Sequence, residues 1–534
     1  MVEKLNVIRP IRIETDAICP RIDDSKVIQE SYAEYMSDES RLEHSYATAL
    51  YFPTSTEEVV AAVKDVAARG EKLVVSGART GIVGGAAMTE PHNLVCLEKL
   101  RTKLSLRFYE QDGNWHAKMA AGITLADLGT ALEEGNFEHA GEGPEKTLFY
   151  PVDPTEKTAL IGGNVATNAS GARTLFYGST RDWVEWLRVV LADGRVLELR
   201  RGQVRALGFE FLFDDEMGEL RPLKLPDITM PRTKATVGYF SSPDMDAVDL
   251  FVGSEGTLGI ITELELRLIE RPSTLIVCQH FDSENRAIDF VLALSASKDP
   301  SPMAMEYFDP HAINLLRQKR AADGNSSCVP ELPERIQALV SVEWAMKEET
   351  EIEKIVDSLE RVLSRIGARP EESWAGCTVK EVERMREIRH ALPETINDII
   401  AQRKTRAPEI HKFGTDIAVP LERLKEMVTI YRRHLDARGL EYVIHGHIGN
   451  GHLHVNVLPR DTQEFSEAKK LYQGFAHEAV RIGGSISAEH GIGKTKRDFL
   501  FIQYPHEAVE QMRKIKQVFD PDGRLNPGVL FHEG

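Results

Sequence analysis

The sequence predicts an α+β fold, arranged as two successive α+β domains behind a short arm. In the first half, capped helices alternate with short β-rich runs that break into glycine loops. The Asp193-Gly194 pair and the alternating segment 257–268 indicate antiparallel strands. After Arg271-Pro272 the strands are mixed with long amphipathic helices, so we place a domain boundary there.

The elements of the first domain follow in order. Residues 1–45 are polar and weakly periodic, and we expect an N-terminal arm; the first domain is 46–270. The predicted elements are a helix over 55–70 with Ser55 and Glu58 as a capping box, a strand over 72–76, a strand over 116–123, a helix capped by Thr124 and Asp127, a hairpin over 184–199, and the strand 257–268.

The second domain is predicted to span 271–534. The runs 274–281 and 338–344 are typical of strands, and 380–392 and 464–482 are typical of amphipathic helices. A chain of 534 residues is too long for one ordinary core, which agrees with more than one domain.

Composition narrows the class of partner. Hydrophobic residues make up 42% and charged residues 28%, as in a globular protein, and the net charge is −18. A nucleic-acid partner requires a basic surface, so we expect no nucleic acid. A small anionic substrate is still compatible with this charge, since a local basic pocket is enough to bind it.

The cysteines argue against metal–thiolate chemistry. No CxxC motif occurs, and five scattered cysteines suggest free thiols in a reducing compartment. The first twenty residues lack the apolar core of a signal peptide, and no run approaches the roughly 20 apolar residues that span a bilayer. We expect a cytoplasmic protein, and leave peripheral association with a membrane open.

Three glycine-rich loops stand out in the first domain. Residues 75–87 follow a strand, and their backbone N–H groups could surround a pyrophosphate, although the loop is neither a Walker A nor a GxGxxG sequence. Residues 150–178 and 251–261 add asparagines, small residues and the carboxylate of Glu255. Each loop taken alone is equally compatible with a tight turn or a surface connection.

Together the loops carry a family resemblance. GGNVATNASG and GSEGTLGIIT resemble the flavin-binding domain of the vanillyl-alcohol oxidase / p-cresol methylhydroxylase (PCMH) superfamily. Within it, the chain is most similar to the FAD-linked D-lactate, glycolate and D-2-hydroxyglutarate dehydrogenases, from about residue 46 to the C-terminus. The resemblance implies a two-subdomain PCMH-type FAD-binding domain, then an α+β cap with an antiparallel sheet, and a C-terminal helical segment that returns to the flavin.

The resemblance also implies which residues bind FAD. The first loop would hold the pyrophosphate, the second the isoalloxazine and ribityl groups, the third the adenine side, and a C-terminal asparagine the ring. The positions are Ser76, Gly77, Ala78, Arg79, Thr80, Gly81, Gly84, Gly85, Pro151, Asp153, Gly163, Asn164, Asn168, Gly171, Glu255, Gly256, Gly259, Ile260 and Asn526. The usual triple glycine is Gly77-Ala78-Arg79 here, in which Arg79 could reach a phosphate. The loop has no histidine, so we expect non-covalent FAD.

The segment HGHIGNGHLH, residues 445–454, concentrates four histidines in ten positions. It predicts a strand, a turn at 449–451 and a second strand, in which His452 and His454 share one face. Imidazoles on the two strands are then available as a pair of metal ligands. The adjacent Glu489 and His490 could complete a site, one binding the metal and the other facing a substrate. The alternative is that these imidazoles only hydrogen-bond within glycine-rich loops.

The family comparison separates these roles. His447, His454 and Glu489 match the ligands of a divalent metal (zinc, manganese or iron), and His490 matches the histidine that meets the substrate hydroxyl. Two positions depart from the family motif: Asn450 replaces an aspartate and His452 replaces an asparagine.

Substrate binding requires a cation. Arg389 matches an arginine that pairs with the substrate carboxylate in the family, and Lys412 is a second candidate. For both residues the alternative is an ordinary solvated charge.

The resemblance implies FAD-dependent oxidation of a D-2-hydroxy acid to the 2-oxo acid. Hydride would pass from C2 to flavin N5, with Arg389 binding the carboxylate, the metal polarising the hydroxyl and His490 as general base. A quinone, a carrier protein or oxygen would accept the electrons, and a homodimer is compatible with the sequence. Two alternatives are a redox-neutral flavin transferase of the alkylglycerone-phosphate synthase type and a metallohydrolase built on the histidines.

Overall fold

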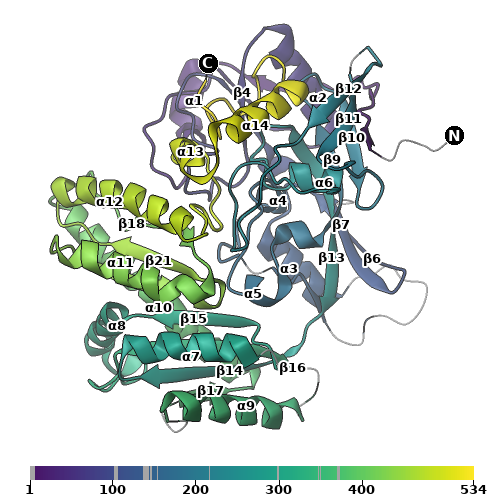
Figure 1. Ribbon diagram of the computed structural model, residues 1–534. Coiled ribbons are helices and arrows are strands. Elements are labelled where there is room, and N and C mark those ends of the chain that lie inside the picture. Colours follow the sequence, from purple (N-terminus) through teal and green to yellow (C-terminus); the bar gives the residue numbers. More distant parts are fainter. Residues whose placement is uncertain are drawn as a thin grey trace.

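The computed structural model describes residues 6–101, 106–135, 144, 147–152, 154–215, 217–297, 300–346, 348, 350–369 and 373–533. Two halves lie one above the other in Figure 1, and the connection between them follows strand β13 (Ile260–Glu270). The C-terminal helices α13 (Leu500–Gln503) and α14 (His506–Phe519), drawn in yellow, lie on the first half. The chain therefore crosses to the second half and returns.

An antiparallel sheet occupies the centre of the first half. Its strand order is β10-β9-β13-β7-β6, and β8 pairs with the end of β13. The strands are β6 (Arg107–Gln111), β7 (Asn114–Ala120), β8 (Leu148–Phe149), β9 (Val184–Val190) and β10 (Val196–Arg200). The helices of this half are α1 (Ser25–Ser31), α2 (Thr56–Ala68), α3 (Leu125–Glu134), α4 (Ile161–Ala166), α5 (Thr174–Tyr177) and α6 (Ala247–Phe251).

A second, smaller sheet has the order β2-β3-β5-β4, with β3–β5 and β5–β4 parallel. Its strands are β2 (Arg21–Ile22), β3 (Ala49–Tyr51), β4 (Leu73–Ser76) and β5 (Asn93–Cys96). Strand β4 ends where the first glycine-rich loop begins. The two sheets are the two subdomains that the resemblance implies, and the α+β fold class is confirmed.

The local signals of the first half are confirmed except for one half of the Ser55–Glu58 capping box, since the Glu58 carboxylate accepts from Thr54 N at 2.7 Å rather than from Ser55 N. The Ser55 hydroxyl accepts a hydrogen bond from Glu58 N at 3.3 Å and caps α2. Thr124 and Asp127 form the complete capping box of α3. Gly194 has φ 82° in the turn between β9 and β10, a conformation that costs glycine little.

The N-terminal arm packs on the first half. Strand β1 (Val7–Ile8) pairs with β11 (Glu210–Asp214), which also pairs with β12 (Leu220–Lys224). Ile28 and Met36 of the arm are fully buried. Its apolar positions are thus part of the core although its sequence shows little periodicity.

The second half is an antiparallel sheet covered by helices on both faces. The strand order is β17-β14-β16-β15-β20-β21-β18, and β19 pairs with β21. The strands are β14 (Ser273–Phe281), β15 (Ala304–Phe308), β16 (Ala338–Met346), β17 (Ser373–Gly376), β18 (Phe413–Gly414), β19 (Ile417–Ala418), β20 (Tyr442–Gly446) and β21 (His452–Val457). This is the antiparallel cap that the resemblance implies.

The cap helices divide into two groups. One core contains side chains of α7 (Glu284–Ser297), α9 (Glu351–Ile366), α11 (Leu424–Asp436) and α12 (Thr462–Arg481), and another contains those of α8 (Pro310–Asp323) and α10 (Val379–Lys404). Ile444 and Val455 point into the first core. The alternate positions, including His445 and His454, therefore lie on the α10 side of the sheet.

The C-terminal segment joins the core of the first half. Ile486, Ile492, Met512 and Leu525 pack there, together with the arm and the central sheet. Leu73 N also donates to Arg524 O, beside β4. This return brings the Glu489-His490 pair back to the glycine-rich loops.

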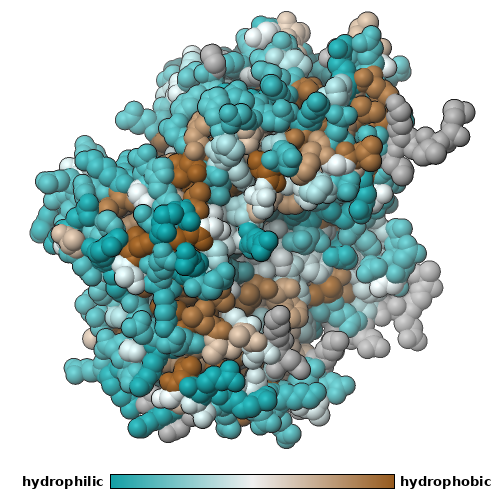
Figure 2. All heavy atoms as spheres, in the orientation of Figure 1, coloured by the Kyte–Doolittle hydropathy of each residue, from teal (hydrophilic) through white to brown (hydrophobic). Residues whose placement is uncertain are grey.

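The surface is mostly hydrophilic on the face shown in Figure 2, with hydrophobic side chains in patches between the two halves. Within the described residues, no helix combines the length and apolar character needed to cross a membrane. The expected cytoplasmic location stays a prediction.

Candidate active site

Two predicted flavin positions, Asn526 and Glu255, connect the first loop, the third loop and the C-terminal segment. The Asn526 side chain accepts from Val75 N at 2.7 Å and donates to Glu255 O at 2.8 Å. The Glu255 carboxylate accepts from Ile492 N at 2.8 Å and Gly493 N at 2.7 Å. Burial raises the pKa of Glu255 to about 7, although these two N–H donors oppose the shift. Glu255 thus ties the third loop to the segment that follows His490.

Four predicted flavin positions other than glycine have a left-handed backbone. The φ angles are 61° at Arg79, 48° at Asn168, 54° at Glu255 and 44° at Asn526. This region is uncommon for residues with a side chain and is found preferentially at ligand sites. The shape of the loops is therefore determined by tertiary contacts rather than by local preference.

The loops fit a polar ligand such as FAD. A Cβ added at Gly81, Gly85 or Gly163 would meet no atom within 4 Å, so the backbone there borders open space. Asn164 Nδ2 and Ser170 Oγ are buried without a hydrogen-bond partner in the described part of the chain. Buried polar atoms nearly always have a partner, so a ligand rich in hydrogen-bonding groups accounts for both.

Other glycines of the predicted set lie where the backbone packs closely against other parts of the same chain. A Cβ at Gly77 would lie 3.1 Å from Leu160, at Gly84 2.5 Å from Leu42 of the arm, and at Gly256 2.5 Å from Asn526. A Cβ at Gly259 would lie 2.4 Å from Val189. Of the remaining predicted positions, Ser76, Pro151 and Ile260 are buried, Ala78 and Thr80 are half-buried, and Gly171 precedes α5, while Asp153 lies outside the described residues.

Arg79 is directed toward the arm. Its guanidinium carbon lies 4.2 Å from the centre of the Tyr35 ring, and its Nη1 lies 3.7 Å from Glu98 Oε2. Tyr35 donates to the same Glu98 carboxylate at 2.5 Å. The cation thus stacks on an aromatic ring of residues 1–45, while its Nη1 also donates to Gly77 O of its own loop at 3.2 Å.

The histidine hairpin and the Glu489 loop form one cluster. His447, His452, His454 and Glu489 each offer a donor atom, and these atoms all lie within 4.8 Å of one another. Glu489 Oε2 lies 3.6 Å from His447 Nε2, and Oε1 lies 3.4 Å from His454 Nε2. The three predicted ligands therefore meet, together with His452. The turn itself differs from the prediction, because residues Ile448–Asn450 form a 3-10 turn that ends at Gly451.

The outer ring nitrogens of two imidazoles are held in place. His447 Nδ1 donates to Glu306 Oε1 at 2.5 Å, and His454 Nδ1 donates to Thr415 O at 3.2 Å. Although burial opposes it, Glu306 raises the pKa of His447, while that histidine and Arg389 lower the pKa of Glu306 to about 2 against its own burial. Such outer partners fix the tautomer and orient the inner nitrogen.

Asp416 links the cluster to His490. It is 1% exposed, and its two oxygens lie 3.3 Å from His452 Nε2 and 3.3 Å from His490 Nδ1. Asp416 also accepts from Lys496 Nζ at 2.7 Å and from the backbone N–H of His490 at 3.0 Å. Burial would raise its pKa, but His490 and Lys496 hold that pKa well below the usual range. Asp416 is therefore an ionised acceptor between two imidazoles.

A lysine from the first half reaches the same cluster. Lys234, 3% exposed, donates to Glu489 Oε2 at 2.5 Å and to Gly171 O at 3.3 Å. With His447 it holds the pKa of Glu489 well below the usual range against the effect of burial. Lys234 compensates the carboxylate charge and would compete with a metal ion for it.

The predicted substrate cations lie on the cap. Arg389 Nε is 3.6 Å from Glu306 Oε2, which places this arginine beside the histidines. Lys412 is exposed and precedes β18, whose Gly414 pairs with Asn456 of β21. Both candidates thus lie on or beside the histidine strands, and Arg389 is linked to the cluster through Glu306, which accepts from His447.

Sequence reasoning missed Glu306, Asp416 and Lys234. Glu306 and Asp416 carried a usable signal, because each is a single carboxylate within a short apolar run, AMEYF and TDIAV. A buried acid at such a position requires a partner. Lys234 carried none: RTKATVGYF resembles an ordinary loop.

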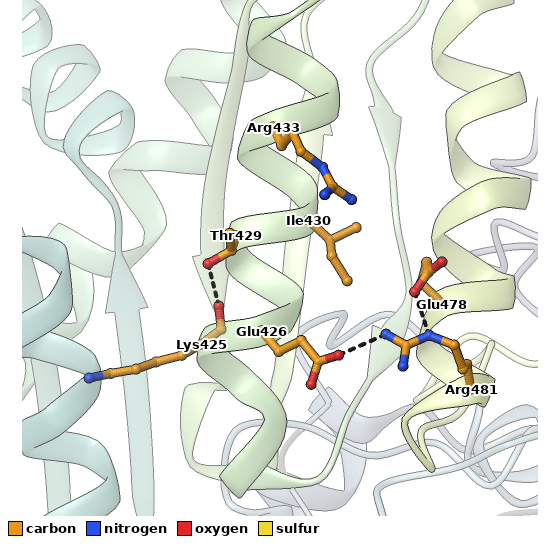
Figure 3. Close-up of a pocket in the computed structure, with 7 residues that line it drawn as sticks. All are labelled: Lys425, Glu426, Thr429, Ile430, Arg433, Glu478 and Arg481. Carbon is orange, nitrogen blue, oxygen red and sulfur yellow. Dashed lines mark hydrogen bonds and ion pairs between the residues drawn. The ribbon is translucent and has the colours of Figure 1, made fainter.

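The groove in Figure 3 is a separate feature of the cap. It lies between α11 and α12, where Arg481 donates to Glu426 at 2.7 Å and to Glu478 at 2.7 Å. Lys425 points away from the groove, toward Asp289 of α7 at 2.5 Å. Arg481 thus pairs with both carboxylates of the groove, and none of the predicted site residues lines it.

Glycine loops that border open space, next to a covering cap with a polar cluster, define a flavoprotein of the two-domain oxidase class. Comparison with known proteins agrees. A model described as "FAD binding domain" matches residues 47–200, and one described as "FAD linked oxidases, C-terminal domain" matches residues 271–530. The chain belongs to this FAD-linked oxidase family and is an FAD-dependent oxidoreductase.

Relatives with assigned names are similar over most of the chain. A D-lactate dehydrogenase of Anaerostipes hadrus is 29% identical over 90% of this chain and 88% of its own length. A mitochondrial D-2-hydroxyglutarate dehydrogenase of Bos taurus is 30% identical over 89% of this chain and 75% of its own length. An alkyldihydroxyacetonephosphate synthase structure has a TM-score of 0.61 at 17% identity, with 98% of this chain and 89% of that one covered, which shows a shared fold.

Proposed function

We propose that this protein oxidises a D-2-hydroxy acid to the corresponding 2-oxo acid. The observation that carries the proposal is the position of His490 and Glu489. They lie among three histidines of the cap, while Glu255 connects the following residues, Ile492 and Gly493, to a flavin loop. The relatives named above as D-lactate and D-2-hydroxyglutarate dehydrogenases support the same substrate class.

Arg389 is the proposed carboxylate-binding residue. Its guanidinium lies on α10 beside Glu306 and the histidine strands, and its side chain is 20% exposed. A guanidinium presents two parallel N–H donors to a carboxylate and holds it in one orientation. Lys412, which is exposed, is the second proposed cation and would add charge at the cap side.

His490 is the proposed general base. Burial lowers its pKa, although Asp416 acts in the opposite direction, so the imidazole is neutral near pH 7. Asp416 lies 3.3 Å from Nδ1, so the proton of the neutral ring is held there. Nε2 is then the atom that takes the hydroxyl proton of the substrate.

FAD, when bound, supplies the acceptor for the hydride from C2, at N5. We propose that it is bound without a covalent link. A divalent metal on His447, His454 and Glu489, when bound, supplies Lewis-acid polarisation of the 2-hydroxyl. The fit of this metal is supported by the inner nitrogens of both imidazoles, which point to the Glu489 carboxylate.

Anaerobic flavin reduction tests the function. The purified protein is mixed without oxygen with D-lactate, glycolate, D-2-hydroxyglutarate and larger D-2-hydroxy acids, and we expect one of them to bleach the flavin band. The L-enantiomers of the chiral acids are the matched controls, and glycolate, which is achiral, has none. Reduction by none of the acids would contradict the proposal, and a colourless protein that releases no FAD on denaturation would contradict the flavin assignment. Reoxidation by oxygen or a quinone analogue then identifies the class of electron acceptor.

A further inference from the structure

His452 is the unexplained residue of the cluster. It is 0% exposed, and while Nε2 faces Asp416 Oδ1 at 3.3 Å, Nδ1 has no hydrogen-bond partner within the described part of the chain. A buried polar atom nearly always has a partner. His452 Nδ1 therefore requires a partner that the protein's own described atoms do not supply.

We propose that His452 is a third imidazole ligand of the metal, so that the ion is held by three histidines and Glu489. This inference rests on the proposed function, which assigns a metal to His447, His454 and Glu489. His452 Nδ1 lies 4.0 Å from Glu489 Oε2, the same oxygen that lies 3.6 Å from His447 Nε2. Its donor atom belongs to the set that lies within 4.8 Å.

The second nitrogen of His452 supports this role. Nε2 lies 3.3 Å from Asp416 Oδ1. An ionised carboxylate only accepts, so the ring proton is at Nε2 and the Nδ1 lone pair faces Glu489. His447 repeats the arrangement with Glu306, and His454 repeats it with the Thr415 carbonyl. All three imidazoles thus have an acceptor behind the outer nitrogen and the inner nitrogen turned to one carboxylate, the arrangement typical of histidine metal ligands.

The neighbouring histidine of the same hairpin shows what a non-ligand looks like. His445 Nε2 accepts from Asn456 Nδ2 at 2.7 Å. His445 does not belong to the group of donor atoms that lie within 4.8 Å of one another, whereas His447, His452 and His454 do. The hairpin therefore contains one imidazole with a hydrogen-bond partner outside this group and three whose inner nitrogens converge.

A third imidazole changes which metal is preferred. Nitrogen donors suit zinc, iron, cobalt and nickel, whereas magnesium and manganese prefer oxygen ligands. A site with three imidazoles and one carboxylate should hold zinc or iron over manganese. His452 is then the residue that determines metal choice in this chain.

The test counts imidazoles around zinc in the FAD-containing protein. X-ray absorption of the zinc-loaded wild type should show three imidazoles, and His452→Asn should show two. Zinc affinity, measured by chelator competition, should fall by at least about 100-fold, because even outer-shell partners of a metal are worth roughly 10- to 100-fold. The ratio of zinc affinity to manganese affinity should be smaller in the same variant than in the wild type. His445→Asn is the matched control and should keep three imidazoles and wild-type affinity.

Two other results separate failure of this inference from failure of the metal site. Two imidazoles in the wild type, with zinc affinity unchanged in His452→Asn, would overturn the role of His452 and leave the metal in place. If the wild type retains no zinc and neither His452→Asn nor His454→Ala changes the measured zinc affinity, the metal site itself is overturned, and with it this inference. The wild-type count needs no variant, so the proposal is tested even if His452→Asn does not fold.

Discussion

Two groups of acidic and histidine side chains are close enough to hold a cation in the described part of the chain, and they differ in construction. One contains His447, His452, His454 and Glu489, which are buried or half-buried; the other contains Glu90, His92 and Glu533 near the chain end. In each group a lysine forms an ion pair with one carboxylate: Lys234 with Glu489, and Lys72 with Glu533. Proximity of donors and a nearby ammonium therefore do not distinguish a metal site.

The difference lies in the number of imidazoles and in what stands behind them. The first group has three imidazoles, each with an acceptor at its outer nitrogen, and the Glu489 side chain is 12% exposed. In the second group the single imidazole of His92 lies 3.7 Å from Glu90, whose side chain is 63% exposed. Exposed carboxylates keep their water and are held in no fixed geometry. Preorganised imidazoles are what make the first group a candidate.

The largest effect is expected from His454→Ala. Loss of this ligand should remove most of the bound metal and lower turnover roughly 10³-fold, since metal polarisation supplies several kcal/mol. FAD should remain, because His454 is outside the flavin loops. Metal analysis, flavin absorbance and turnover are measured on the same sample. His92→Gln, in the second group, should keep metal and turnover, and wild-type turnover in His454→Ala would refute the metal role.

The second effect concerns the base rather than the metal. His490→Ala should keep both FAD and metal but slow flavin reduction by about 10²-fold or more, the usual contribution of a positioned base. Stopped-flow bleaching with the true substrate measures this step directly. The pH profile distinguishes a base from a packing residue, because the wild-type rate should fall on acidification as the imidazole becomes protonated, and this limb should be absent in the variant. Fast bleaching by His490→Ala would contradict the assignment.

Asp416→Asn should have an intermediate effect on the metal and a clear effect on stability. The change weakens the acceptor behind His452, which should lower metal affinity by about 10- to 100-fold. It also leaves the buried Lys496 without its carboxylate, which costs about 3–5 kcal/mol in comparable pairs. Chelator competition and thermal unfolding measure the two separately. Lys496→Gln is the control: it breaks the same ion pair, so it should lose stability while metal affinity stays unchanged.

The same contrast explains what could be predicted from the sequence. The caps of α2 and α3 and the Gly194 turn were predictable, because their hydrogen bonds join residues only a few positions apart. The convergence of His447, His454 and Glu489 was predictable because a family motif names these positions as ligands.

The supporting residues could not be found in this way. Glu306 meets His447 across 141 positions, Lys234 meets Glu489 across 255, and Asp416 meets the Glu489 backbone across 73. No local pattern encodes such pairs. The pair Glu306–His447 exists only once the cap sheet has formed, and Lys234–Glu489 only once the segment that contains Glu489 lies against the first half. Nor could the sequence distinguish the second group of donors from the first, because the two groups differ in burial, which is a property of the tertiary structure.

The smallest effect is expected in the second group. Burial lowers the pKa of His92, although Glu533 and Glu90 oppose the shift, so the folded state disfavours its protonation. The stability that neutral His92 contributes is complete above its ordinary pKa near 6.5 and is lost as the pH falls through the lower folded value. His92→Gln should remove this weak pH dependence of the free energy of unfolding. It is measured as the difference between the wild-type and variant free energies of unfolding at pH 7 and at pH 5. We expect this group to bind no metal, so the difference should be the same with and without added zinc. A difference that grows with zinc at pH 7 and vanishes at pH 5 would show that this group binds a cation after all.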